Sequence, residues 1–252
     1  YSVLADTSGY ARSLIVDGYV VGLRVLETTE RRAAHVGLSL SPNPKSVLTL
    51  GIGSGGSLKA IAAYTEPSRV DVLLPFRSMQ EGVKRYCGDT LKEFSTARPE
   101  VSLRFRYGDL RSFLRIELKR WSLIQSHIDW LATPTLRRDA VSVKTLQLVR
   151  QHLTDDGLFS LTVPLEVSPI ALRSVIFNFA EVFPEGHVWF VQPHQVVFVG
   201  SPTIGNGPRL SLSRFYERAA QPEYMSELER VQFTTKEELP GSRVCGISAL
   251  RD

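Results

Sequence analysis

The feature that most constrains the fold is a glycine-rich stretch that follows an apolar, β-branched run at residues 46–50. Four glycines come directly after this run: Gly51, Gly53, Gly55 and Gly56. A helix-like segment, 58–64, follows them. A strand that ends in glycines and continues as a helix brings bare backbone N–H groups close to a ligand. The pattern is typical of the first βα turn of a nucleotide-binding sheet, and a simple tight turn is the alternative.

Strand-like and helix-like segments alternate along the chain after this stretch. Strands are expected at 69–74, 101–107, 121–127 and 158–163, and helices at 78–94, 111–119, 141–152 and 169–182. A turn is expected at Asp155-Asp156-Gly157, and two β-rich runs, 187–192 and 195–200, read as a closing antiparallel hairpin. The alternation predicts an α/β fold, with a doubly wound, mostly parallel seven-stranded sheet covered by helices on both faces.

Shorter elements are expected at both ends of the chain. Asp17-Gly18 predicts a hairpin with arms at 10–16 and 19–25. Thr28-Thr29-Glu30 is expected to cap a helix over 31–40, which the prolines at 42 and 44 end. After residue 201 we expect a helical tail, with helices at 212–220 and 222–231. Three parts are therefore predicted: 1–40 with the hairpin and linking helix, 41–200 as the main domain, and 201–252 as a tail packed on it.

Charge and composition narrow the function classes. The formal net charge of +4 comes from scattered residues, which predicts no nucleic-acid partner. Cys87 and Cys245 have no metal-type spacing, so no metal is expected. We expect both to be free thiols in a reducing, cytoplasmic location. The sequence has no apolar run of the roughly 20 residues that span a bilayer. It begins at Tyr1 rather than Met, which is compatible with a piece of a longer, membrane-anchored protein.

Several motifs together resemble the spermidine synthase (polyamine aminopropyltransferase) family. They are Ser41-Pro42-Asn43-Pro44-Lys45, the strand and Gly-x-Gly-x-Gly-Gly after it, and Gly108-Asp109. The likeness covers about residues 9–200. Within the family, Ile124-Gln125-Ser126-His127-Ile128-Asp129-Trp130 is similar to the branch fused to membrane segments. The resemblance implies the S-adenosylmethionine-dependent methyltransferase fold with a small N-terminal β-domain.

The resemblance also implies a set of site residues. Those expected to bind the cofactor, S-adenosylmethionine or its decarboxylated form, are Gly51, Gly53, Ser54, Gly55, Gly56, Asp109 and Leu110. Those expected to bind a small-molecule amine substrate are Glu30, Ser54 and Asp129. His127 and Asp129 are the catalytic candidates. A homodimer is the expected assembly.

This chain departs from the family pattern at several of these positions. Ser54 stands where the glycine loop normally carries an Asp that faces the amino group of the transferred chain. Residues 72–75 are apolar where an acid normally holds the ribose, and Asp71 lies one step early. His127 stands at the place of the catalytic Asp, and Thr29-Glu30 at that of a Tyr-His pair that contacts the polyamine. The family's early Gln would lie before Tyr1.

Two functions are predicted on these grounds. As an enzyme, the chain would transfer an aminopropyl or methyl group to an amine. As a degenerate relative, it would act as a binding or structural module through protein contacts, and the missing ribose acid and catalytic Asp speak for this alternative. At the level of single residues, Asp109 and Asp129 could instead be helix or loop caps, and His127 a hydrogen-bonded strand-end side chain. Phe76 could stack on an adenine or, with Pro75, fill the ribose space.

Overall fold

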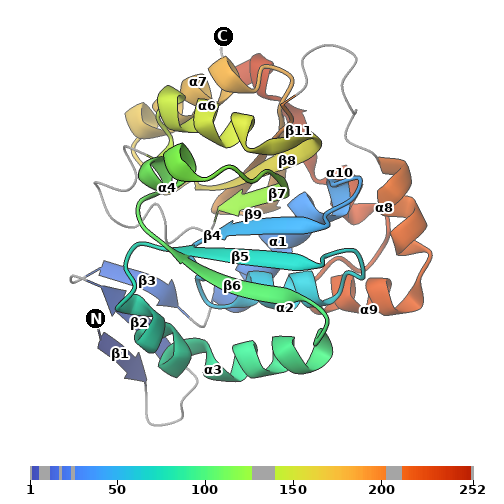
Figure 1. Cartoon of the computed structure of the whole chain (residues 1–252). Coiled ribbons are helices and arrows are strands. Elements are labelled where there is room, and N and C mark those ends of the chain that lie inside the picture. Colours follow the sequence, from blue (N-terminus) through green and yellow to red (C-terminus); the bar gives the residue numbers. More distant parts are fainter. Residues whose placement is uncertain are drawn as a thin grey trace.

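The computed structural model describes residues 2–5, 12–16, 19–23, 26–126, 140–202 and 212–250. Its centre is an eight-stranded sheet in the order β11-β9-β10-β8-β7-β4-β5-β6 (Figure 1). These strands are β4 (Ser46–Leu50), β5 (Arg69–Leu74), β6 (Ser102–Tyr107), β7 (Trp121–Ser126), β8 (Leu153–Pro164), β9 (His187–Gln192), β10 (Gln195–Gly200) and β11 (Arg243–Gly246). The five strands from β8 to β6 are parallel, and β10, β9 and β11 add antiparallel pairs.

The predicted α/β class is confirmed, but the strand number is eight rather than seven. The extra strand, β11, comes from the part of the chain expected to be a helical tail. It pairs antiparallel with β9 at the edge of the sheet. Sequence reasoning missed it because four residues with exposed or half-buried side chains carry no strand periodicity.

Helices cover both faces of the sheet. One face carries α1 (Glu27–Leu40), α2 (Gly56–Ala62) and α3 (Met79–Ala97), with α8 (Leu212–Ala219) and α9 (Pro222–Arg230) packed beside them. The other face carries α4 (Leu110–Ile116), α6 (Val143–Gln151) and α7 (Pro169–Val182). Successive strand residues point to opposite faces, so Val47 joins the first core and Leu48 the second. The chain ends with α10 (Glu238–Gly241), β11 and a 3₁₀ turn, Ile247–Leu250.

A small separate sheet lies at the N-terminus (Figure 1). Its strands β2 (Arg12–Val16) and β3 (Tyr19–Leu23) pair antiparallel with Val16 opposite Tyr19, as the hairpin prediction requires. A further strand, β1 (Ser2–Ala5), pairs with β2. The predicted turn residues Asp17 and Gly18 lie outside the described residues.

Two local predictions were wrong. Helix α1 begins at Glu27, so Thr28, Thr29 and Glu30 lie inside its first turn and cap nothing. The expected turn at 155–157 lies within β8, where the pairing with β7 shifts register between Trp121 and Leu123. In both cases tertiary packing overrides a local preference, since α1 packs along the sheet and β8 follows β7.

The C-terminal end of α1 is held by a buried arginine from α8. The guanidinium of Arg218 donates from Nη1 to the carbonyl oxygens of Leu38, Ser39 and Ser41 at 3.2, 2.9 and 3.0 Å. Its Nη2 also lies 2.8 Å from a carboxylate oxygen of Glu66. The last carbonyls of a helix have no intrahelical partner, so this side chain satisfies groups that burial would otherwise leave unpaired.

A second buried polar cluster joins α1 to α9. The hydroxyls of Ser39, Tyr64 and Tyr224 lie 2.6 to 3.2 Å from one another. His35 lies between Tyr64, 3.0 Å from its Nδ1, and Glu227, 3.1 Å from its Nε2. Burial lowers the pKa of His35, which keeps the imidazole neutral.

Within the described residues, no helix combines the length and hydrophobicity needed to cross a bilayer.

We expect Arg218→Met to lower the free energy of unfolding by about 3 kcal/mol, because it leaves three carbonyls and Glu66 without their cation. The matched control is Arg214→Met, one turn earlier on the same helix, whose exposed guanidinium pairs with Glu217. This variant should change stability by less than about 1 kcal/mol. Urea unfolding followed by circular dichroism measures both, and equal losses would contradict the assignment.

Candidate functional site

The candidate site lies at the edge of the sheet where the parallel strands end. The carboxyl ends of β4, β5, β6 and β7 share this edge because the strands run in one direction. Strand β4 lies between β5 and β7, so the chain changes direction across the sheet at this point. In open α/β sheets ligands bind in the crevice outside such a switch point.

The glycine turn occupies the carboxyl end of β4. Gly51, Gly53 and Gly55 have φ angles of 85°, 53° and 89°, a region that residues with a side chain rarely adopt. The turn is closed by hydrogen bonds from Gly51 N to Leu73 O and from Gly55 N to Ile52 O, both 2.9 Å. The strand–glycine–helix arrangement expected from the sequence is therefore present, with α2 starting at Gly56.

Glu30 reaches from α1 into this turn. Its carboxylate oxygen Oε2 accepts hydrogen bonds from the backbone N–H of Ser54 at 2.7 Å and from the Ser54 hydroxyl at 2.5 Å. A Cβ at Gly53 would collide with the same carboxylate. The resemblance placed Glu30 and Ser54 in one substrate site, and the structure brings them into contact. It brings them together because α1 begins early enough to point Glu30 at the turn.

The carboxyl group of Glu30 is 1% exposed. Burial raises its pKa from the ordinary 4.5 to about 8, against the lowering effect of the Ser54 hydrogen bonds, and Glu27 on the same helix adds a smaller raising effect. In the unliganded protein, the group is therefore largely protonated at pH 7.

Three buried polar groups near the turn have no hydrogen-bond partner among the described residues. They are the second oxygen of Glu30, Oε1, the side-chain amide of Gln125 and the hydroxyl of Ser126, which lies opposite Leu50. Gln125 lies on β7 directly beside Thr49 of β4. Thr49 is two residues before Gly51 in the chain. Buried polar groups are nearly always paired, so unpaired ones near a switch point indicate a place for a ligand or water. The sequence had shown Gln125 only as part of a family motif.

The end of β5 offers no carboxylate. Val72, Leu73 and Leu74 are fully buried, and Phe76 behind Pro75 is 47% exposed. The nearest acid in the sequence, Asp71, does not take this place, because its carboxylate is bound by other side chains.

The two carboxylate oxygens of Asp71 accept hydrogen bonds from Trp121 Nε1 at 2.9 Å and from Arg106 Nε at 3.1 Å. Arg69 Nε lies 3.1 Å from the same carboxylate. Asp71 is thus a buried structural group between β5, β6 and β7.

Asp109 and Leu110 follow β6 at the same edge. The carboxylate of Asp109 caps α4 by accepting from Ser112 N at 2.9 Å, and this hydrogen bond lowers its pKa. The side chain of Asp109 remains exposed at the edge, whereas that of Leu110 is buried in the core. The capping role proposed as the alternative for Asp109 is present, and the cofactor roles of both residues stay predictions.

The two catalytic candidates, His127 and Asp129, lie outside the described residues. His127 directly follows Ser126, the last residue of β7, and Asp129 is two residues further along the chain. Among the described residues, no group of three His, Cys, Asp or Glu side chains is arranged to hold a metal ion.

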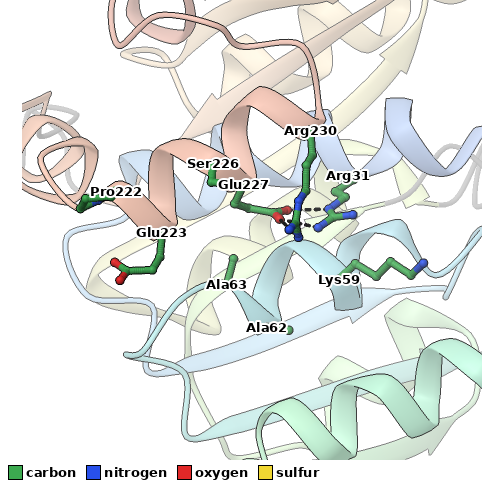
Figure 2. Close-up of a pocket in the computed structure, with 9 residues that line it drawn as sticks. All are labelled: Arg31, Lys59, Ala62, Ala63, Pro222, Glu223, Ser226, Glu227 and Arg230. Carbon is green, nitrogen blue, oxygen red and sulfur yellow. Dashed lines mark hydrogen bonds and ion pairs between the residues drawn. The ribbon is translucent and has the colours of Figure 1, made fainter.

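A surface pocket between α1, α2 and α9 is distinct from this site (Figure 2). Arg31 and Arg230 turn toward Glu227, and Arg31 Nε lies 2.5 Å from that carboxylate. Lys59 pairs with Glu27 at 2.9 Å. Because these cations already have carboxylate partners, the pocket is an ion-paired seam between helices.

We expect Glu30→Gln to remove one component of the pH dependence of stability. The unfolded chain loses the Glu30 proton near pH 4.5, but the folded chain keeps it to about pH 8. The stability of the unchanged protein relative to Glu30→Gln should therefore fall between these values, at up to about 1.4 kcal/mol per pH unit.

Urea unfolding at pH 5, 6, 7 and 8 measures this difference. Glu27→Gln, three residues earlier and paired with Lys59, is the control and should keep the component. Parallel pH profiles for Glu30→Gln and the unchanged protein would contradict the buried position of this carboxyl.

Comparison with protein-family models finds no match. Curated relatives do match over part of the chain. A polyamine aminopropyltransferase of Streptococcus pneumoniae is 29% identical over 85 residues, 33% of this chain and 30% of that protein. Spermidine synthase 1 of Pisum sativum is 32% identical over 117 residues, 44% of this chain and 32% of the pea enzyme. A polyamine aminopropyltransferase of Desulforudis audaxviator is 24% identical over 205 residues, 80% of this chain and 72% of that protein.

Solved structures share the fold over almost the whole chain. The spermidine synthase of Thermotoga maritima superposes with a TM-score of 0.72 at 18% identity, covering 98% of this chain and 83% of that one. A spermidine synthase in complex with the transition-state analogue AdoDATO gives a TM-score of 0.71 at 17% identity, with the same coverage. Human methyltransferase-like protein 13, in complex with SAH, gives 0.57 at 20% identity, covering 80% and 90%. The resemblance expected from the sequence is confirmed: this chain is a divergent relative of the spermidine synthases, built on a methyltransferase-like fold.

Proposed function

We propose that this chain binds decarboxylated S-adenosylmethionine at the carboxyl edge of its sheet and transfers the aminopropyl group to an amine. The observation that carries the proposal is the glycine turn at the switch point between β4 and β7, with φ values that only glycine adopts readily. Relatives named as aminopropyltransferases and a neighbour solved with AdoDATO support the same ligand class.

The residues at the edge fit such a nucleoside unequally. The backbone of the glycine turn lies at the switch point, and the unpaired Oε1 of Glu30 provides an acceptor beside it. Asp109 and Phe76 present an exposed carboxylate and an exposed aromatic ring at the neighbouring strand ends. The ribose end fits less well, since β5 ends in buried apolar side chains where paired ribose hydroxyls call for a carboxylate.

The chemistry asks little of the protein beyond positioning and one base. The sulfonium of the donor makes the adjacent carbon electrophilic and leaves as a neutral thioether nucleoside. The attacking amine must be neutral, so a group within hydrogen-bond reach has to take up its proton. We propose His127 or Asp129 for this role, because His127 is the first residue after β7 and Asp129 is the third. An imidazole with an ordinary pKa near 6.5 suits proton uptake at neutral pH.

A second candidate function is a binding module that has lost catalysis and acts through protein contacts. The apolar end of β5 favours it, because weak ribose binding would leave the donor site poorly occupied. The two candidates differ in whether nucleosides bind at all, which calorimetry decides.

We expect methylthioadenosine and decarboxylated S-adenosylmethionine to bind, more weakly than to a relative that has the ribose acid. Asp109→Ser separates the two roles of Asp109, because Ser caps a helix about as well as Asp but carries no carboxylate. If the carboxylate contacts the adenine, Asp109→Ser should weaken methylthioadenosine binding about tenfold at unchanged melting temperature. Lack of binding by the unchanged chain would favour the non-catalytic module.

We expect His127→Ala to lower turnover at least a hundredfold while leaving the affinity for methylthioadenosine unchanged, as loss of a general base does. The measurement is the release of methylthioadenosine from decarboxylated S-adenosylmethionine with linear diamines and triamines as acceptors. Asp129→Asn, assayed in parallel, tests the other candidate base. Full turnover by both variants would contradict both assignments.

A further inference from the structure

The glycine turn contains a carboxyl group that belongs to another element. Glu30 comes from α1, yet its Oε2 is fixed by both the N–H and the hydroxyl of Ser54 in the middle of the turn. These two hydrogen bonds leave the other oxygen, Oε1, without a partner among the described residues. The carboxyl group is thus held in place through Oε2, and Oε1 remains as an unpaired acceptor.

Among the residues that the structure describes, none supplies a cation to balance an ionised Glu30. Of the cations on α1 and α2, Arg31 pairs with Glu227, Lys59 pairs with Glu27, and the guanidinium of Arg32 lies over the ring of Phe233. The charged group that acts on Glu30 is Glu27 of the same helix, and the turn contributes only the Ser54 and Gly56 hydrogen bonds. Among the described residues, no Lys or Arg lies within ion-pair distance of this carboxyl.

A buried acid with a free oxygen and no counter-ion is stabilised by a ligand that brings a positive charge. The side-chain amide of Gln125, on the strand β7 that pairs with β4, also has no partner and offers a carbonyl acceptor at the same edge of the sheet. An ammonium group has three N–H donors, which matches such a set of oxygen acceptors.

We infer that Glu30 is the residue that binds the ammonium end of the aminopropyl donor, and that it selects the decarboxylated nucleoside over S-adenosylmethionine. The second nucleoside carries a carboxylate beside its ammonium, which the Glu30 carboxylate would repel. This inference rests on the proposed function and names the determinant of donor choice within that site. In this chain the acid is supplied by α1, because the loop position itself is Ser54.

The inference fixes the protonation change on binding. The unliganded Glu30 is mostly protonated at pH 7, because burial raises its pKa to about 8. An ammonium group stabilises the ionised carboxylate, so the carboxyl proton passes to the buffer when the ligand binds. A ligand with the same nucleoside and no ammonium gives no such release.

Isothermal titration calorimetry of the whole chain at pH 7, in two buffers of different ionisation enthalpy, tests the inference. The probes are decarboxylated S-adenosylmethionine, S-adenosylmethionine and methylthioadenosine, which lacks the charged chain. We expect the decarboxylated donor to bind more tightly than the other two and to release about one proton, and methylthioadenosine to release none.

Glu30→Gln should keep the affinity for methylthioadenosine, lose about tenfold or more of the preference for the decarboxylated donor, and lose its proton release. Glu27→Gln is the matched control and should keep both. Ser54→Ala, which leaves the acid in place but removes its hydroxyl donor, should weaken the preference to a smaller extent. Melting temperatures of all variants report folding separately.

The outcomes separate the two levels of the proposal. If methylthioadenosine binds but Glu30→Gln retains the donor preference and the proton release, the role of Glu30 is overturned and the proposed function stands. If the unchanged chain binds none of the three nucleosides, the proposed function fails, and the role of Glu30 fails with it.

Discussion

The close approach of α1 to the glycine turn is the constraint on which the rest of the site depends. A Cβ at Gly56 would lie 2.5 Å from the carbonyl oxygen of Glu27 and 2.9 Å from the backbone nitrogen of Arg31. A Cβ at Gly53 would collide with the carboxylate of Glu30. The glycines therefore serve two purposes here. They allow the left-handed backbone of the turn, and they leave the space that a helix from the N-terminal part of the chain fills.

The C-terminal tail holds the other end of the same helix. Arg218 satisfies the last carbonyls of α1, and Glu227 of α9 accepts from Arg31 and lies beside His35. These contacts fix the position of α1 along the sheet, and so the distance from Glu30 to Ser54. The tail also supplies β11, which extends the sheet beyond β9. Segments far apart in the chain thus contribute to the geometry at one strand end (Figure 1).

The two halves of the carboxyl edge differ in chemistry. The half at the glycine turn has a buried acid with a free oxygen, whereas the half at the end of β5 is apolar. Asp71, the acid nearest to the ribose position in the sequence, is occupied by Trp121 and two arginines. The edge therefore offers more hydrogen-bond acceptors to a positively charged, amine-bearing chain than to a ribose. This asymmetry supports the proposal that the edge binds the charged end of an aminopropyl donor more firmly than its ribose.

The sequence by itself determined the class of the fold, since alternating strands and helices behind a glycine-ended strand leave few other arrangements. The family resemblance also placed Glu30 and Ser54 in one predicted site, and predicted Asp109 to be either a cap or a ligand. Only the tertiary structure decided that α1 starts at Glu27, that β11 joins the sheet, and that Asp71 is a structural acid. The reason is that periodicity records which face of an element is buried but not which distant element buries it. The hydrogen bonds of Ser54 to Glu30, 24 residues away in the chain, arise only when α1 packs against the turn.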